Sequence, residues 1–424
     1  MSAAAARPSG SQAAGSSALP GVRTFGSPRF RLLVAALLAG FGVLANIVFL
    51  IILDNPIRPW GEDFEAYYFA AQRVAEGLSP YTSDQLASPV DAVCPGCYLY
   101  PPLLAQLLVP VTALPLGVAV TGWFALNSVL AYAAVWLALS IGGAARSMER
   151  ALWSLVAVTF YFPVFQSNWL GNVSTFTGLL AVLVAAGGTV AGLAVTAGLL
   201  LKLTPAAWAP AVLVGSRSSR LALLISLSVV LGVFVLLAPA GWLDYPAVLR
   251  NLLAGSGEVD WNLGWAVLAQ EAGLSDPVAT LARASSMALA VAALAASAWV
   301  ARRADGMPAA AVLGTATLLL LPGTFWYHYL AVLLPLAALA WPRAGRSARA
   351  ILLLSAAVVS ITGIVFEPLL AQLGAAGVLV TATRVLWPGA FVHDRRPSDG
   401  GGERRPPGVR LERTKRTRGR NQAS

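Results

Sequence analysis

The sequence is short of charged residues. Only 11% of its 424 residues are Asp, Glu, Lys or Arg, whereas 57% are hydrophobic. A soluble domain has about 25% charged and roughly 45–50% apolar residues. The mean hydropathy of +0.71 therefore excludes a large soluble protein with a buried core, and we expect one polytopic membrane domain with polar tails.

Regular alternation of apolar and polar residues is also lacking, which disfavours an outer-membrane barrel. The apolar runs are long and rich in Leu, Ala and Val, so the sequence predicts an all-α polytopic membrane protein. No short charged-then-apolar signal with a cleavage site opens the chain. We expect residues 1–30 to form a disordered cytoplasmic tail, residues 31–391 the transmembrane domain, and residues 392–424 a basic disordered tail in the cytoplasm.

Runs of about 20 apolar residues are long enough to span a bilayer. Five runs meet this length and four are shorter; they are 31–53, 117–141, 221–240, 277–300 and 350–368, then 151–165, 309–325, 329–341 and 375–391. Together with the segments discussed next, they predict about twelve spans.

Two apolar stretches need separate treatment. The segment Pro101–Pro115 is too short to cross, so we expect an interfacial helix on the outer surface. The stretch 173–214 must cross an odd number of times to reach the basic turn that follows it. Breaks near Gly187-Gly188 and at Lys202–Pro205 predict three short helices there.

Positive charge is scarce in two long loops. Residues 54–100 carry seven acids and two arginines, and residues 241–276 carry five acids and one arginine. Four arginines and no acid precede the first span. Because Lys and Arg near span ends favour the cytoplasm, the first loop, 54–116, should lie outside a plasma membrane and both termini inside.

The basic C-terminal tail suits contact with anionic membrane lipids. Nucleic-acid binding is disfavoured, because the arginines are scattered through short turns and a tail without interleaved aromatic residues.

The chain has only two cysteines, Cys94 and Cys97, in the predicted outer loop. A disulfide is favoured there, with free thiols as the next alternative. Two cysteines alone cannot fill a tetrahedral zinc site. We expect no metal and no cofactor, and no Gly-rich nucleotide loop is evident.

Polar residues gather on the predicted outer side. They lie at Asp63, Tyr98–Pro102, Gln166–Asn172, Trp242–Trp265 and Tyr327–Tyr329. Polar groups are energetically expensive at membrane depth, so such a cluster is a functional hypothesis by default. Acids just outside the first span are placed where water-soluble chemistry meets a lipid-borne substrate.

Several of these segments together resemble a known family. The segments Asp63–Ala71, Glu76–Tyr81 and Tyr98–Leu103 resemble the first outer loop of integral-membrane glycosyltransferases of the GT-C fold, and in particular glycosyltransferase family 87. Further segments follow the pattern of that family in order: Pro163–Asn172, Gly198–Pro205 and Trp326–Tyr329. The resemblance covers residues 31–345. The later outer loop departs from it, since Trp261–Gly264 replaces an Asn-Gln-Ser-type motif.

The resemblance implies a GT-C-like fold and a polyprenyl-phosphate sugar donor, with mannose favoured and arabinofuranose next. It also implies a glycolipid or glycan acceptor and inversion in one step. A carboxylate can take the proton of the acceptor hydroxyl, and we assign this role to Asp63. Glu62 is placed to bind acceptor hydroxyls or to raise the pKa of Asp63 by repulsion; Glu65 suits a solvated loop.

The growing charge on the leaving phosphate needs cationic or hydrogen-bonding partners. His328 and Lys202 are our candidates, with a structural histidine and a snorkelling lysine as the alternatives. Asn168 and Asn172 suit helix caps as well as ligands. Tyr67 and Tyr98 are candidate substrate contacts, although tyrosines also form interfacial belts.

Two other classes stay open. A polytopic transporter or lipid flippase would explain the spans but not the long acidic first loop. A lipid-linked-glycan ligase or polymerase with a diphosphate donor would need arginines on the outer loops, whereas this chain places nearly all of its arginines inside.

Overall fold

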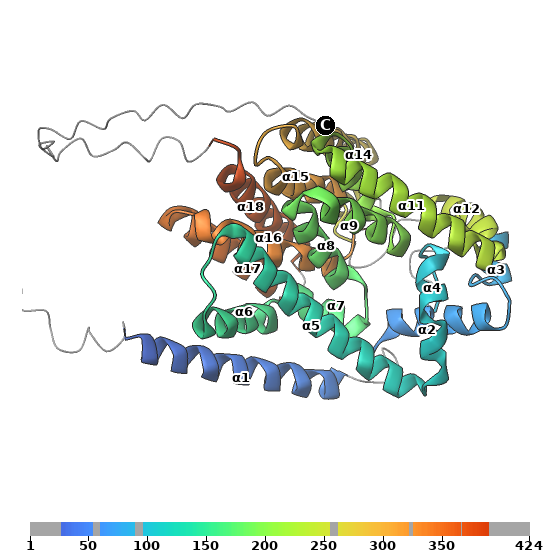
Figure 1. Cartoon of the computed structure of the whole chain (residues 1–424), viewed down its shortest axis with the longest axis horizontal. Coiled ribbons are helices and arrows are strands. Elements are labelled where there is room, and N and C mark those ends of the chain that lie inside the picture. Colours follow the sequence, from blue (N-terminus) through green and yellow to red (C-terminus); the bar gives the residue numbers. More distant parts are fainter. Residues whose placement is uncertain are drawn as a thin grey trace, which may run out of the picture. The chain divides into compact units, whose positions relative to one another are not determined.

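The computed structural model describes residues 27–53, 60–89, 96–254, 262–321, 325–365 and 367–389. All helices belong to the first of two compact units, Met1–Pro388; of the second unit only Gly389 is described. The described residues contain helices and no strand, and a single β-bridge joins Asn262 to Trp326. The predicted all-α fold is confirmed for this part of the chain (Figure 1).

The described residues form α-helices and short 3-10 helices. In chain order they are α1 (Pro28–Leu53), α2 (Glu62–Ala75), α3 (Ser83–Ala87), α4 (Pro102–Leu108), η1 (Val109–Ala113), α5 (Leu116–Gly142), α6 (Met148–Phe160), α7 (Phe162–Leu170), α8 (Ser174–Ala186), α9 (Gly188–Leu201), η2 (Thr204–Trp208), α10 (Ala209–Gly215), α11 (Arg217–Leu237), α12 (Pro239–Ala254), α13 (Trp265–Glu271), α14 (Asp276–Ala301), α15 (Met307–Leu320), η3 (Tyr327–Val332), α16 (Leu333–Ala340), η4 (Trp341–Arg343), α17 (Arg346–Val365) and α18 (Pro368–Leu386).

Six of these helices are long and apolar enough to cross a membrane by length and composition: α1, α5, α11, α14, α17 and α18. Large apolar side chains are exposed on them, for instance Leu37 at 64% and Leu236 at 83%, as expected of surfaces that face lipid. The predicted runs at 31–53, 117–141, 221–240, 277–300 and 350–368 coincide with five of these helices, α1, α5, α11, α14 and α17. The predicted total of about twelve spans stays a prediction.

Two predicted runs differ from the observed helices. The run 151–165 is interrupted at Tyr161, where α6 ends and α7 begins. Pro163 lies in the first turn of α7, a position proline favours because its missing N–H has no intrahelical partner there. The run 375–391 begins earlier than expected, because α18 starts at Pro368 and ends at Leu386.

The stretch 173–214 is broken where the sequence predicted. Gly187 separates α8 from α9 with a φ of 75°, a conformation that glycine adopts readily because it lacks a Cβ. The second break is at Lys202, whose extended φ of −159° ends α9. The two breaks confirm the predicted helix boundaries and take Lys202 out of the helix.

The described part of the first loop contains α2, α3, α4 and η1; α2, α4 and η1 pack together beside α5 (Figure 1), and α3 packs against α12. Their shared core is aromatic, with Phe64, Tyr67, Tyr81 and Tyr98 each almost fully buried. The short helix predicted for Pro101–Pro115 is present as α4 and η1. This aromatic core fixes α2, and with it the acids of its first turn.

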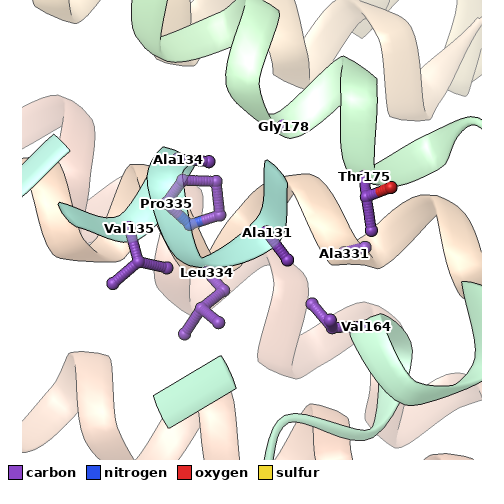
Figure 2. A pocket seen from close by; sticks show the side chains of 9 residues that line it. All are labelled: Ala131, Ala134, Val135, Val164, Thr175, Gly178, Ala331, Leu334 and Pro335. Atoms are coloured by element: carbon purple, nitrogen blue, oxygen red, sulfur yellow. The ribbon is translucent and has the colours of Figure 1, made fainter. Parts of the chain in front are cut away.

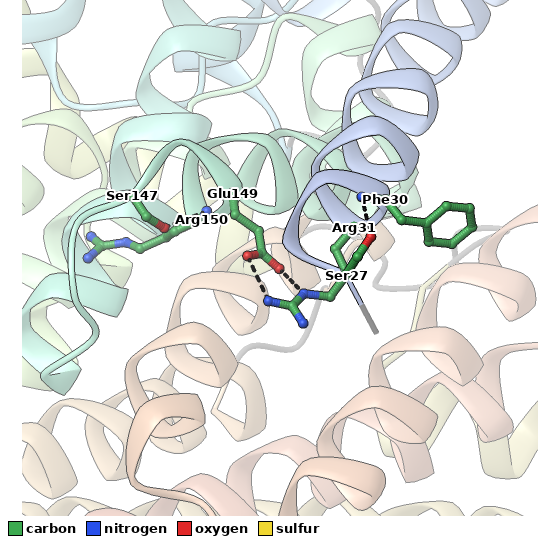
Figure 3. A network of polar contacts seen from close by, with 6 residues as sticks. All are labelled: Ser27, Phe30, Arg31, Ser147, Glu149 and Arg150. Carbon is green, nitrogen blue, oxygen red and sulfur yellow. Dashed lines mark hydrogen bonds and ion pairs between the residues drawn. The ribbon is translucent and has the colours of Figure 1, made fainter. Parts of the chain in front are cut away.

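An ion pair joins the N-terminal end of α1 to α6. Arg31 Nε lies 2.8 Å from Glu149 Oε1 (Figure 3). The neighbouring Arg150 turns the other way, with its guanidinium 4.0 Å from the centre of the Trp136 ring and hydrogen bonds to backbone carbonyls. These contacts tie α1 and α5 to α6, far in sequence from the acids of α2.

Candidate active site

Helix α2 begins at a glycine that no other residue replaces without strain. Gly61 has a φ of 91°, and its N–H donates to the Trp169 carbonyl over 2.9 Å. A Cβ on Gly61 would lie 2.8 Å from Val120 Cγ1. The backbone therefore turns sharply against α5 and α7, and the next two residues, Glu62 and Asp63, open the helix.

Asp63 is bound by a residue 109 positions away. Asn172 Nδ2 donates to Asp63 Oδ2 over 2.7 Å and also lies 3.0 Å from the Tyr100 hydroxyl. Asn172 belongs to the corner between α7 and α8, next to Gly171, whose φ is 72°. A Cβ on Gly171 would lie 2.7 Å from Phe64 Cβ, so glycine permits the close approach of this corner to α2.

The surroundings of Asp63 alter its acidity. Partial burial raises the pKa of Asp63 from 3.8 to about 6, because the charged carboxylate loses part of its hydration. The hydrogen bond from Asn172 and the charge of Lys202 oppose this rise, and repulsion from Glu62 adds to it. At neutral pH the carboxylate is ionised yet more basic than a solvated aspartate, which suits a proton acceptor.

Lys202 lies in the gap between α9 and η2. Its Nζ is 3.6 Å from the centre of the Tyr329 ring and 5.5 Å from that of Tyr100. A small pocket beside it is lined by Ser174, Thr177, Lys202, Thr204, Leu318 and Tyr329, four of which carry hydroxyl groups. The pocket combines the Lys202 ammonium with hydroxyl groups and adjoins Ser174, the first residue of α8. Such an environment is suitable for an anion.

His328 also contacts Tyr329. Its ring meets Tyr329 edge-on, with 4.8 Å between ring centres. The side chain is 5% exposed, and Nε2 has no hydrogen-bond partner among the described residues. Both predicted phosphate partners thus contact Tyr329, and His328 keeps a buried nitrogen available for hydrogen bonding.

The segment carrying His328 is held by a residue of the later loop. Asn262 Oδ1 accepts from the N–H of Phe325 over 2.8 Å, and Leu263 N–H donates to the Phe325 carbonyl over 2.7 Å. Asn262 is therefore placed to support the backbone beside His328.

The tyrosines of the first loop differ in what they contact: Tyr98 bonds to the loop backbone, whereas Tyr67 and Tyr100 lie toward Asn172. The Tyr98 hydroxyl donates to the Pro101 carbonyl over 2.5 Å and accepts from Ala105 N–H over 3.1 Å, so it serves the loop structure. Tyr67 is 1% exposed and meets the Tyr100 ring edge-on at 5.0 Å. Tyr100 is the member that touches Asn172. Burial and the Asp63 charge raise the pKa of Tyr100, so it stays a neutral phenol.

The other predicted residues lie nearby without meeting Asp63. Asn168 is buried, and its Nδ2 donates to Ser128 Oγ of α5 over 3.2 Å. Glu62 and Glu65 are partly exposed on the first turns of α2. Cys97 is disulfide-bonded, whereas Cys94, its predicted partner, lies outside the described residues.

Sequence reasoning missed the partners of the predicted residues. Tyr329, Ser174, Thr177 and Thr204 line the pocket beside Lys202; the sequence motifs include Tyr329 and Thr204 without assigning them a role, and they do not include Ser174 and Thr177. A local signal existed for one of them, because Asn172 and Ser174 are two residues apart, the spacing of an Asx turn. In the described part of the chain, no group of three or more His, Cys, Asp or Glu side chains is placed to hold a metal ion. The absence of a metal stays a prediction.

Comparison with known proteins gives one match. The model of glycosyltransferase family 87 matches residues 98–322. Neither the curated proteins nor the solved structures contain a match to this chain. The matched region includes Asn172 and Lys202 and begins after Asp63. Because it spans more than half of the 424 residues, this multi-pass membrane chain belongs to glycosyltransferase family 87.

Proposed function

We propose that this membrane glycosyltransferase moves a hexosyl or pentosyl unit from a polyprenyl-phosphate donor to a glycolipid or glycan acceptor. Mannose is the favoured sugar and arabinofuranose the next. The observation that carries the proposal is the Asp63 carboxylate, held by Asn172 beside the pocket of Lys202. One end of this site suits a proton acceptor and the other suits an anion.

Asp63 is the general base of the proposed reaction. The acceptor hydroxyl oxygen attacks the anomeric carbon, its proton passes to Asp63 Oδ1, and the bond from that carbon to the phosphate oxygen breaks. The electron pair of the broken bond stays on the polyprenyl phosphate. Attack from the face opposite the leaving group inverts the anomeric carbon in one step.

The leaving phosphate gains charge as this bond breaks, and cationic or hydrogen-bonding groups stabilise such charge. Lys202 offers an ammonium, and Thr177 and Thr204 offer hydroxyls in the same pocket. His328 Nε2, buried and unpartnered among the described residues, is available for a phosphate oxygen. The pocket is also next to Ser174, the first residue of α8, where a helix dipole favours an anion.

The site lies on the extracytoplasmic side of the plasma membrane in this proposal, with both termini cytoplasmic and about twelve spans in a GT-C-like fold. The support is the excess of acids over arginines in residues 54–100 and 241–276, since Lys and Arg near span ends favour the cytoplasm. A lipid-linked donor would present its sugar at that interface.

The test is a transfer assay on membranes that contain the protein, with radiolabelled polyprenyl-phosphate mannose and polyprenyl-phosphate arabinose supplied separately. We expect label in acceptor lipid or glycan from one donor, and at least about a hundredfold less with Asp63→Asn, since general-base catalysis contributes 10²–10⁴-fold. Glu65→Gln is the matched control and should retain most activity. Transfer from neither donor, or full activity of Asp63→Asn, would overturn the proposal.

A further inference from the structure

Asn172 is distinguished from the other polar residues of the site because every hydrogen-bonding group it carries is already used. An asparagine side chain offers two N–H donors and an oxygen with two lone pairs, and its backbone adds one donor and one acceptor. The structure supplies a partner for each of these donors and acceptors.

The backbone of Asn172 is fixed first. Its N–H donates to the Ser167 carbonyl over 2.8 Å. Its own carbonyl accepts from Asn127 Nδ2 and from Ser167 Oγ, each over 3.2 Å. Asn127 lies on α5 and is itself fully buried. The α7–α8 corner is thereby tied to a long helix before the side chain makes any contact.

The side-chain amide is then fixed in one orientation. Oδ1 accepts from the N–H of Ser174 over 2.9 Å and from the Ser174 hydroxyl over 2.6 Å. A backbone N–H only donates, so the atom facing it must be the amide oxygen. The amide nitrogen consequently points the other way, and its two hydrogens reach Asp63 and Tyr100.

This arrangement leaves Asn172 nothing with which to bind a substrate. It also occupies only one oxygen of Asp63, since Oδ1 of that carboxylate accepts no hydrogen bond from the described residues. We propose that Asn172 is a positioning residue, which holds the Asp63 carboxylate by Oδ2 so that Oδ1 alone faces the acceptor hydroxyl. This inference rests on the proposed function. Ser174 has a supporting role, because it sets the orientation of the amide.

The physical benefit is orientation. A carboxylate on a free side chain samples several rotamers, and reactions slow sharply when reacting groups are misplaced by about 1 Å. A hydrogen bond to the charged form also lowers the pKa of a carboxyl, and the bond from Asn172 has this effect on Asp63. Loss of the amide should therefore change both turnover and the pH at which Asp63 ionises.

The experiment compares the full-length protein with Asn172→Ala and Asn172→Asp in two measurements. The first is the pH profile of sugar transfer. The second is infrared titration of the protonated Asp63 carboxyl, identified as the band that Asp63→Asn removes. Asn251→Ala is the matched control, because Asn251 also joins two helices through its Nδ2, to the Gln85 and Leu86 carbonyls, but lies outside the site.

We expect Asn172→Ala to move both midpoints to higher pH by about one unit, with kcat lowered about tenfold or more and the KM values nearly unchanged. Asn172→Asp keeps the shape and adds a like charge, so its shift should be larger, and it replaces Asn172→Ala if that variant does not fold. Asn251→Ala should shift neither midpoint.

Unchanged midpoints in both Asn172 variants, or a rise in KM alone, would overturn the inference and make Asn172 a structural or substrate-binding residue. The infrared arm needs no substrate. A shifted infrared midpoint in a protein that transfers neither sugar would therefore support the positioning of Asp63 while refuting the proposed function, so the two failures are distinguishable.

Discussion

The Lys202 ammonium lies over the ring of Tyr329, with its nitrogen 3.6 Å from the ring centre. A cation over an aromatic face gains about 0.5–2 kcal/mol, more when it is removed from water. Lys202 ends its helix in an extended conformation, so the ring is what directs its charge toward the pocket shared with Ser174 and Thr204. The ring therefore determines where an anion would be held.

Removing the ring should weaken donor binding more than removing its hydroxyl. We expect Tyr329→Leu to raise the donor KM several-fold, and Tyr329→Phe, which keeps the aromatic face, to stay close to wild type. Lys202→Gln should raise it about tenfold or more, since a hydrogen bond to a charged group contributes about 1.5–3 kcal/mol. Steady-state kinetics with varied donor measure all three. Equal values for the Leu and Phe variants would show that the ring does not position Lys202.

His328 should contribute to the same end of the site. Because its Nε2 is buried and unpartnered among the described residues, the imidazole is free to contact the leaving phosphate. We expect His328→Ala to raise the donor KM or lower kcat, with an unchanged elution profile in size-exclusion chromatography. A change of less than about twofold, roughly 0.4 kcal/mol, would assign His328 to packing against Tyr329 instead.

The pH profile follows from the raised pKa of Asp63, about 6. The base works only when ionised, so kcat/KM should fall as the pH drops through 6. Loss of the Lys202 charge removes an interaction that lowers this pKa, so Lys202→Gln should move the midpoint to higher pH. Assays from pH 5 to 8.5 test both, and a wild-type midpoint near 4 would mean that a solvated carboxylate is the base.

Much of the fold could be predicted because its causes are local. Long apolar runs predict α1, α5, α11 and α14, and the break at Gly187 needs only the knowledge that glycine adopts a positive φ. The interruption at Tyr161 was missed because the apolar run continues through it, although Pro163 was a local signal, since proline favours the first turn of a helix.

The sequence named candidate site residues one by one but not their arrangement, and the roles of these residues stay predictions. The position of Asp63 directly after the first span indicated a role, and motif order indicated Asn172 and Lys202. The contact between Asp63 and Asn172 joins residues 109 positions apart. It depends on two glycines, Gly61 and Gly171, that allow α2 and the α7–α8 corner to approach. Such packing is a tertiary property, with no signal in a single sequence.

Gly171 should be intolerant of even one methyl group. Gly171→Ala would meet Phe64 Cβ at 2.7 Å in addition to the strain of a positive φ, about 1–3 kcal/mol. Gly143→Ala is the matched control, because Gly143 also has a positive φ, 100°, but an open space for a Cβ. We expect Gly171→Ala to lower transfer activity at least tenfold by displacing Asn172 from Asp63, and Gly143→Ala to lower stability only. Similar activities of the two variants would mean that the corner can shift without consequence.

Asp63 itself should make the protein less stable at neutral pH. Its pKa rises from 3.8 to about 6 on folding, so between these values the folded chain binds more protons than the unfolded chain. Stability contributed by this group therefore falls as the pH rises from about 4 to 6, by up to about 3 kcal/mol, and stays lower above that range.

Asp63→Asn removes the charge while keeping the shape, and Asn172 can still donate to its side-chain oxygen. We expect Asp63→Asn to raise the thermal unfolding midpoint in detergent by about a few degrees at pH 7 and to leave it nearly unchanged at pH 4, with the exposed Glu76→Gln as a control that changes little at either pH. A variant that is inactive and also less stable at pH 7 would indicate that Asp63 is needed for folding, whereas an inactive and more stable one would show a destabilising charge retained for catalysis.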